Sequence, residues 1–266
     1  MGTYAVSDLH GYPVEKFKAL LDGVGFTDED TLYVLGDVID RNGDGGVELL
    51  RYIITQPNIE LIIGNHEEML LACDFLFNEI ADDALPFSNI GNAMAYFNYL
   101  SNGGRVTIES LRELSKNEPK AVGDILDYLR DAPHIGALTV GSRDFLLVHS
   151  GLGKFDPCKK ISEYTPEDIL WTRPELDTEY FDDIITVFGH TPTLYYGDEY
   201  CGKVLKTRTW IDIDVGAGQG LPPALLRLDD LGIFVKSFRI PPLIIVDAVK
   251  LNERDDFFKL GFVLLP

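Results

Sequence analysis

Metal-binding residue types recur where short apolar, strand-like segments of this sequence end. Asp8 and His10 follow the segment "TYAV", and side chains two residues apart in an extended chain point to the same face, so these two can share one ion. Four further segments end in the same way, at Asp37, Asn65, His149 and His190. Together these residues offer nitrogen and oxygen donors, a set that suits Mn, Fe or Zn better than Ca.

Each of these residues has a simpler interpretation when it is taken alone. A single aspartate at a strand end is more often a turn or cap residue, and a single histidine is more often a structural one. Four of the five histidines, however, lie near glycine at strand ends: His10, His66, His149 and His190. His134 follows Pro133 in a predicted loop and keeps the simpler interpretation. The recurrence therefore predicts a metal site.

Helices and strands alternate through the first third of the chain. Strands are predicted over residues 3–8, 31–37 and 59–65, and helices over 14–24, 47–56 and 67–80. Pro13 and Gly25 are suited to the ends of the first helix, and Asn65 is suited to cap the third. This alternation predicts an α/β sheet with helical crossovers, whose strand ends gather the candidate ligands at one edge.

The middle of the chain, about 70–132, has helical periodicity and no strand signal, which predicts a helical insertion beside the sheet. Strand signals return at Ile135. A hairpin is predicted over 137–151 with its turn at 141–143, and consecutive strands are predicted over 183–191, 209–218, 224–232 and 233–240, with a tight turn at "LDDLG". Residues 241–266 give no clear prediction.

Composition limits the classes of protein to which the chain can belong. Acidic residues outnumber basic ones by 43 to 23, and the resulting charge of −20 disfavours a nucleic-acid partner. The three cysteines form no CxxC pair, and no apolar run is long enough for a membrane span. Strand-like sequence begins at Thr3, so we expect no signal peptide and a cytoplasmic protein. The sequence does not indicate an oligomeric state.

Five short motifs carry a family resemblance. "SDLHG", "GDVIDRN", "GNHE", "HSG" and "GHTP" occur in this order from position 7 to about 192. They resemble the signature blocks of the metallophosphoesterases, in particular of the phosphoprotein phosphatase family, and "YLSNGGRVTIES", "LWTR" and "IDVGAG" resemble its bacterial members. The resemblance implies a calcineurin-like four-layer sandwich, in which two mixed β-sheets are flanked by helices. It places a metallophosphoesterase domain at 1–240, with the insertion at 70–132, and leaves 241–266 as an extension of uncertain role.

The resemblance also implies a centre of two divalent ions, Mn with Fe or Zn as alternatives. It assigns the first ion to Asp8, His10 and Asp37. It assigns the second ion to the bridging residue Asp37 together with Asn65, His149 and His190.

The same resemblance assigns catalytic roles. Arg41 and Arg173 would hold the phosphoryl oxygens, and a hydroxide shared by the ions would attack phosphorus in line. His66, held by Asp40, would protonate the leaving oxygen. Asn42 stands where the family has glycine, and we expect it to adopt the left-handed backbone conformation that glycine would supply.

Three functions follow from these assignments. The first is a metallophosphatase acting on phosphoserine or phosphothreonine in proteins, or on a small phosphoester. The alternative is a hydrolase of dinucleoside polyphosphates such as diadenosine tetraphosphate, although those relatives typically carry alanine at the position of Asp40. A non-catalytic scaffold of the same fold is a second alternative, disfavoured because every ligand position holds a competent residue.

Overall fold

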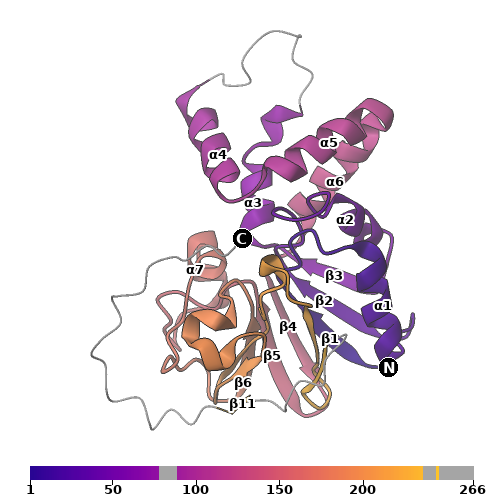
Figure 1. Ribbon diagram of the computed structural model, residues 1–266. Coiled ribbons are helices and arrows are strands. Elements are labelled where there is room, and N and C mark those ends of the chain that lie inside the picture. Colours follow the sequence, from indigo (N-terminus) through magenta and orange to yellow (C-terminus); the bar gives the residue numbers. More distant parts are fainter. Residues whose placement is uncertain (78–88, 236–243, 246–266) are drawn as a thin grey trace.

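Two β-sheets pack face to face, with helices outside both of them (Figure 1). The computed structural model describes residues 1–77, 89–235 and 244–245. The strand order is β10-β9-β1-β2-β3 in the first sheet and β11-β7-β8-β6-β5-β4 in the second. Both sheets mix parallel and antiparallel pairs, so the predicted α/β class with two mixed sheets flanked by helices is confirmed.

The first sheet contains the amino-terminal strands and a late hairpin. Its strands are β1 (Thr3–Val6), β2 (Thr31–Leu35), β3 (Ile59–Ile62), β9 (Ala224–Arg227) and β10 (Gly232–Val235). β1, β2 and β3 run parallel, whereas β9 lies antiparallel to β1 and pairs with β10 across the predicted "LDDLG" turn. The carboxyl ends of the three parallel strands therefore lie at one edge of the sheet.

The second sheet repeats this arrangement with later strands. They are β4 (Ile135–Val140), β5 (Arg143–Val148), β6 (Ile184–Phe188), β7 (Leu205–Lys206), β8 (Trp210–Asp212) and β11 (Ile244–Ile245). The pairing of Val140 with Arg143 confirms the predicted hairpin turn, and β5, β6 and β8 run parallel. The predicted succession of strands after residue 209 changes sheet, because the glycine-rich 3₁₀ turn η5 (Ala217–Gln219) carries the chain from β8 to β9.

The helices are α1 (Val14–Val24), α2 (Val47–Ile54), α3 (Asn65–Leu71), α4 (Ile90–Ser101), α5 (Arg105–Asn117), α6 (Pro119–Asp131) and α7 (Pro166–Leu170). As predicted, α1 starts directly after Pro13 and ends directly before Gly25; the backbone of Gly25 is left-handed. The predicted cap of α3 is wrong: Gly64 occupies the cap position, and Asn65 is the first helical residue. α3 ends at Leu71, and residues 78–80 of its predicted extent lie outside the described residues.

The predicted insertion carries no strand in its described parts, 70–77 and 89–132. Its helices α5 and α6 pack on α2, and they stand with α4 beyond the end of the first sheet (Figure 1). Most of the predicted extension, residues 241–243 and 246–266, lies outside the described residues, so the boundary at 240 stays a prediction. Across the described ranges, no helix combines the length and apolarity needed to cross a membrane.

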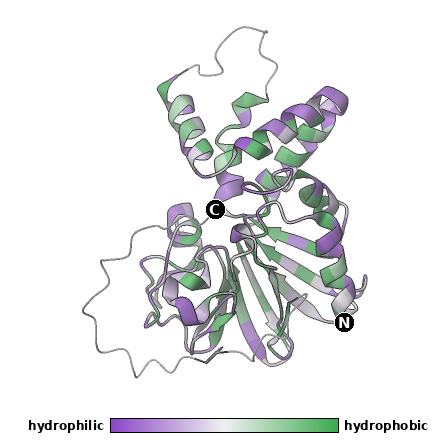
Figure 2. Cartoon of the chain, viewed as in Figure 1, coloured by the Kyte–Doolittle hydropathy of each residue, from purple (hydrophilic) through white to green (hydrophobic). Residues whose placement is uncertain are grey.

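The side chains of each strand alternate between the two faces of its sheet and so contribute to two different hydrophobic cores. In β1, Tyr4 and Val6 join a core beneath α1 and α2, whereas Ala5 joins the core between the sheets. In β5, Phe145 belongs to that middle core and Leu146 to a third core beneath α7. Because successive side chains of a strand point to opposite faces, both faces of each sheet are buried. Figure 2 shows hydrophobic residues along the strands, and hydrophobic residues interspersed with hydrophilic ones along the helices.

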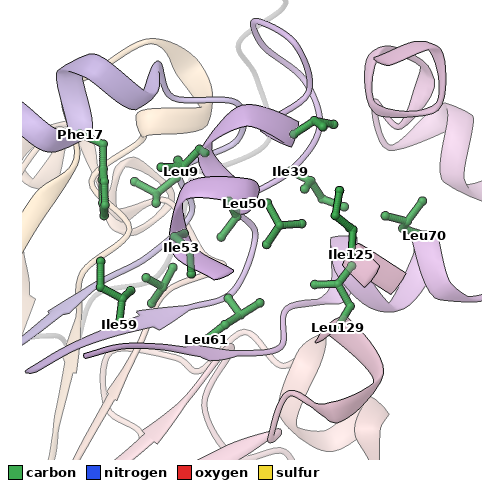
Figure 3. Close-up of a cluster of buried hydrophobic side chains, with 14 of the residues drawn as sticks. Leu9, Phe17, Ile39, Leu50, Ile53, Ile59, Leu61, Leu70, Ile125 and Leu129 are labelled. Atoms are coloured by element: carbon green, nitrogen blue, oxygen red, sulfur yellow. The ribbon is translucent and has the colours of Figure 1, made fainter. Parts of the chain in front are cut away.

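The core beneath α2 provides a test of this packing. Ile53 of α2 is fully buried among the side chains of β3 and α6 (Figure 3), whereas Ile90 of α4 is 80% exposed. We expect Ile53→Ala to lower the free energy of unfolding by about 2–5 kcal/mol, because it removes buried methyl groups and leaves a cavity. The matched change Ile90→Ala should alter it by no more than about 0.5 kcal/mol. Equal effects in urea denaturation would contradict the assigned core.

Candidate metal centre

The six predicted ligands lie at the carboxyl ends of parallel strands from both sheets. Those of the first sheet follow β1, β2 and β3, and those of the second follow β5 and β6: Asp8, His10, Asp37, Asn65, His149 and His190. A backbone hydrogen bond joins the two sets, because the N–H of His190 donates to Asp8 Oδ2 at 2.8 Å. All six are almost completely buried. The structure therefore brings together residues that are up to 182 positions apart.

Glycines and strained backbone make this crowding possible. A Cβ atom on Gly64 would lie 2.4 Å from Asp37 Oδ1, and one on Gly189 would lie 2.1 Å from Asp8 Oδ2, so neither position accepts a side chain. Six predicted site residues have positive φ angles: Asp8, His10, Asp37, Asp40, Arg41 and His190. This conformation is costly for residues other than glycine and is concentrated at functional sites.

Two histidines present lone pairs to carboxylate oxygens. Nδ1 of His10 lies 3.0 Å from the Ile39 carbonyl, and Nδ1 of His149 lies 2.7 Å from the Leu35 carbonyl. A carbonyl only accepts, so each Nδ1 carries the hydrogen, and the Nε2 of a neutral ring carries the lone pair. Nε2 of His10 lies 3.5 Å from Asp37 Oδ2, and Nε2 of His149 lies 3.4 Å from Asp37 Oδ1. Acceptors that face each other in this way fit a cation between them.

The remaining donors extend the same arrangement. Asn65 Oδ1 lies 2.8 Å from His149 Nε2 and 3.0 Å from His190 Nδ1. Nε2 of His190 is buried without a hydrogen-bond partner among the residues that the structure describes. The donor atoms of three residues lie within 4.8 Å of one another in each of two groups, and both groups contain Asp37: His10, Asp37 and His66, and Asp37, His149 and His190. The residues present thus fit two divalent ions that share Asp37.

Burial and the neighbouring charges both favour the neutral forms of the donor groups. Burial raises the pKa of Asp37 well above its usual range, and the nearby Asp8 and Glu67 carboxylates add to this effect. Burial also lowers the pKa of His10 well below its usual range, so this ring is neutral. The neighbouring buried carboxylates repel one another, and a bound cation would favour their charged forms.

Asp40 and His66 form a separate pair beside these donors. Asp40 Oδ2 lies 2.6 Å from His66 Nδ1, and both side chains are buried. Burial raises the pKa of Asp40 to about 7, and it lowers the pKa of His66, an effect that the Arg41 charge reinforces. Arg41 Nη2 lies 3.0 Å from His66 Nε2. Since a guanidinium only donates, His66 is neutral here and donates through Nδ1 to Asp40. Both ring nitrogens are engaged, although His66 lies close enough to Asp37 to be a ligand.

The two predicted arginines contact different residues of the site. Arg41 contacts His66, and its backbone N–H donates to the Gly103 carbonyl at 3.3 Å. Arg173 donates to the His190 carbonyl at 3.4 Å and to Thr191 Oγ1 at 3.3 Å. Its guanidinium also lies over the Tyr195 ring, 5.6 Å from the centroid. All ten predicted site residues therefore gather in one place, while their individual roles stay predictions.

Asn42 does not behave as expected from the family glycine. The left-handed residues around it are Asp40, Arg41 and Gly43, so the expectation for Asn42 itself was wrong. Instead, its Nδ2 donates to the His10 carbonyl at 3.0 Å and to the Gly218 carbonyl at 3.2 Å. The substitution ties the η5 turn to the loop of a candidate ligand.

Glu67 organises the site, and sequence reasoning gave it only a place in the first turn of α3. Its Oε2 accepts from the backbone N–H groups of Asp37 at 2.8 Å and Gly64 at 3.0 Å, and its Oε1 accepts from that of Val38 at 2.8 Å. One buried carboxylate thus fixes the loops after β2 and β3. Its place directly after "GNH" was the available signal. Tyr99 and Thr107, both of which donate to Asp40, were also missed.

Comparison with known proteins assigns the family. Residues 1–215 match the family described as calcineurin-like phosphoesterase. Together with the two mixed sheets and the gathered donors, this match shows that the chain belongs to the calcineurin-like phosphoesterase family. Membership implies a dinuclear centre of divalent ions, for which the described residues supply candidate ligands.

Two curated relatives share a name. Symmetrical bis(5'-nucleosyl)-tetraphosphatase of Acidovorax sp. is 24% identical over 201 residues, which cover 73% of this chain and 59% of the relative. The protein of the same name from Salmonella paratyphi B is 33% identical over 118 residues, which cover 43% of this chain and 41% of the relative. The chain thus spans between two fifths and three fifths of the length of these relatives.

Two solved structures share the fold. A protein serine/threonine phosphatase from Saccharomyces cerevisiae, with similarity to human phosphatase PP5, aligns with a TM-score of 0.53 at 15% identity. The alignment covers 91% of this chain and 81% of the phosphatase. A provisionally assigned diadenosine tetraphosphatase aligns with a TM-score of 0.52 at 18% identity, covering 88% and 92%. Identities this low support the fold alone.

The contacts of Glu67 lead to a prediction about metal affinity. In Glu67→Gln, an amide NH₂ replaces one acceptor oxygen and faces backbone N–H groups, so the loops of Asp37 and Asn65 lose their common anchor. We expect Mn²⁺ to bind about 10–100-fold more weakly, as is typical when a residue that orients ligands is replaced. Calorimetric titration of chelator-treated protein measures this change. Glu68→Gln, at the half-exposed neighbouring position, is the control and should bind as the unaltered protein does; equal losses in both variants would contradict the role of Glu67.

Proposed function

We propose that this protein is a metal-dependent phosphomonoester hydrolase that acts on phosphoserine or phosphothreonine side chains of proteins. Family membership supports phosphoester chemistry, and the gathered donors support a site for two divalent ions, with Mn²⁺ as the expected metal. We assign the first ion to Asp8, His10 and Asp37. We assign the second to Asp37, Asn65, His149 and His190.

The chain's own residues hold the substrate around these ions. Divalent ions bound there supply Lewis-acid activation of water and neutralise phosphoryl charge. Arg41 binds the phosphoryl oxygens, because its planar fork of donors matches that anion. Arg173, anchored by the His190 carbonyl and Thr191, is the second group that binds these oxygens.

The contact between Asp40 and His66, 2.6 Å long, is the observation that carries the choice of a phosphomonoester. An alkoxide from serine or threonine is a poor leaving group and needs a proton. Asp40 orients the imidazole so that Nε2 points away from it, toward Arg41. When the guanidinium turns to a phosphoryl group, its charge no longer faces Nε2. This nitrogen then takes a proton from solvent water and passes it to the leaving oxygen, while Nδ1 keeps its hydrogen on Asp40.

A second candidate function is the hydrolysis of dinucleoside polyphosphates. The curated relatives named for that activity favour it. Its leaving group is a phosphate, which needs less protonation, so the buried Asp40–His66 pair would contribute less to that reaction. Asp40 thus supports phosphomonoester hydrolysis over the hydrolysis of dinucleoside polyphosphates.

Substrate preference distinguishes the two functions. We expect chelator-treated protein to be inactive on p-nitrophenyl phosphate and to regain activity with Mn²⁺. With Mn²⁺ present, kcat/KM should be higher for a phosphoserine peptide than for diadenosine tetraphosphate, measured by release of inorganic phosphate and by separation of nucleotides. The reverse preference would support the second function, and no chelator-sensitive activity on any of the three substrates would refute both.

The Asp40–His66 pair predicts a dependence on the leaving group. Asp40→Asn should lower kcat for the phosphoserine peptide by about 10²–10⁴-fold, the usual contribution of a positioned acid. p-Nitrophenolate leaves without protonation, so kcat for p-nitrophenyl phosphate should fall much less. The control is Asp44→Asn, a change on the same loop, where the carboxylate accepts from the backbone N–H groups of Gly46 and Glu48 at the start of α2. Equal losses on both substrates would exclude the general-acid role.

A further inference from the structure

Asp40 is held from two sides by residues of distant elements. Its Oδ2 contacts His66, whereas its Oδ1 accepts from the Tyr99 hydroxyl at 2.7 Å and from Thr107 Oγ1 at 2.5 Å. Tyr99 belongs to α4 and Thr107 to α5, both within the helical segment beyond the first sheet. Both donors are completely buried. The carboxylate is therefore held by two hydroxyl groups that both donate to Oδ1.

Tyr99 also has an unusual place in its own helix. It is the one completely buried side chain of α4, whose Ile90 and Met94 are 80% and 67% exposed. A buried tyrosine hydroxyl requires a hydrogen-bond partner, and this one uses the Asp40 carboxylate. Burial, and next the Asp40 charge, raise the pKa of the Tyr99 hydroxyl well above its usual range, so the group stays a neutral donor.

The turn between α4 and α5 is shaped around these contacts. A Cβ atom on Gly104 would lie 2.4 Å from the Tyr99 ring, so glycine leaves the space that the ring occupies. Gly103, with a φ of 100°, accepts a hydrogen bond from the backbone N–H of Arg41. The same turn thus seats Tyr99 against Asp40 and supports the backbone of the arginine.

We propose that Tyr99 is a positioning residue for leaving-group protonation. By donating to Oδ1, it fixes the carboxylate in the orientation in which Oδ2 receives the proton on His66 Nδ1, and so directs His66 Nε2 toward the substrate. The inference rests on the proposed function. It adds that the helical segment takes part in the reaction by holding Asp40 through the Tyr99 hydroxyl.

Kinetics on two substrates provides the first test. Tyr99→Phe removes the hydroxyl and keeps the ring; it should lower kcat for the phosphoserine peptide about tenfold, since the lost hydrogen bond is to a charged group. KM for the peptide, and kcat for p-nitrophenyl phosphate, should change less than twofold. Tyr96→Phe, the same change one turn earlier on α4, should leave both rates unaltered. Equal losses on the two substrates in Tyr99→Phe would show a merely structural role and overturn the proposal.

A spectroscopic measurement on metal-free protein tests the positioning without turnover. The short hydrogen bond from His66 to Asp40 should give a far-downfield ¹H resonance that His66→Asn abolishes. Tyr99→Phe should shift this resonance, and Tyr96→Phe should not; an unchanged resonance in Tyr99→Phe would overturn the proposal. Thr107→Val removes the other donor to Oδ1 and should shift the resonance as well. If Tyr99→Phe does not fold, Thr107→Val is the variant to measure, and an unchanged resonance in it would overturn the proposal. If the unaltered protein hydrolyses no phosphoester, the proposed function fails and this resonance alone tests the positioning.

Discussion

The site depends on an electrostatic conflict among buried acceptor atoms that bound cations would resolve. Backbone carbonyls fix the hydrogens of His10 and His149 on Nδ1, which leaves their Nε2 lone pairs facing the oxygens of Asp37. Asp37 itself lies beside further buried carboxylates, and its pKa is raised by burial and by their charges. Buried groups that repel one another cost stability unless they are compensated. Positive ions between these atoms turn each of these unfavourable contacts into a favourable one.

The fold holds this arrangement by placing strand ends together. Each sheet directs the carboxyl ends of parallel strands to the same edge, and the hydrogen bond from His190 to Asp8 joins the two edges. Glu67 anchors two of the loops, Asn42 connects a third to the η5 turn, and glycines allow the side chains to approach. Left-handed backbone at six site residues shows that the surrounding packing, and not local preference, determines their conformation.

Much of this could be predicted from the sequence, because the signals are local. Apolar segments that end in Asp, Asn or His indicated both the strands and the donors that gather at their ends, and Pro13 and Gly25 marked the limits of α1. Contacts that depend on distant elements gave no such signal. Tyr99 and Thr107 approach Asp40 from helices 59 and 67 residues further along the chain. Asn42 and Asn65 were misjudged because local preference suggested a left-handed turn and a helix cap, whereas tertiary contacts use their side chains elsewhere.

The central claim is that two ions lie among these donors and share Asp37. Anomalous diffraction from crystals soaked in Mn²⁺, recorded near the manganese absorption edge, tests this claim most directly. The account predicts two peaks, one between His10 and Asp37 and one among Asp37, His149 and His190. The absence of any peak among these residues, at a Mn²⁺ concentration that restores activity, would contradict it.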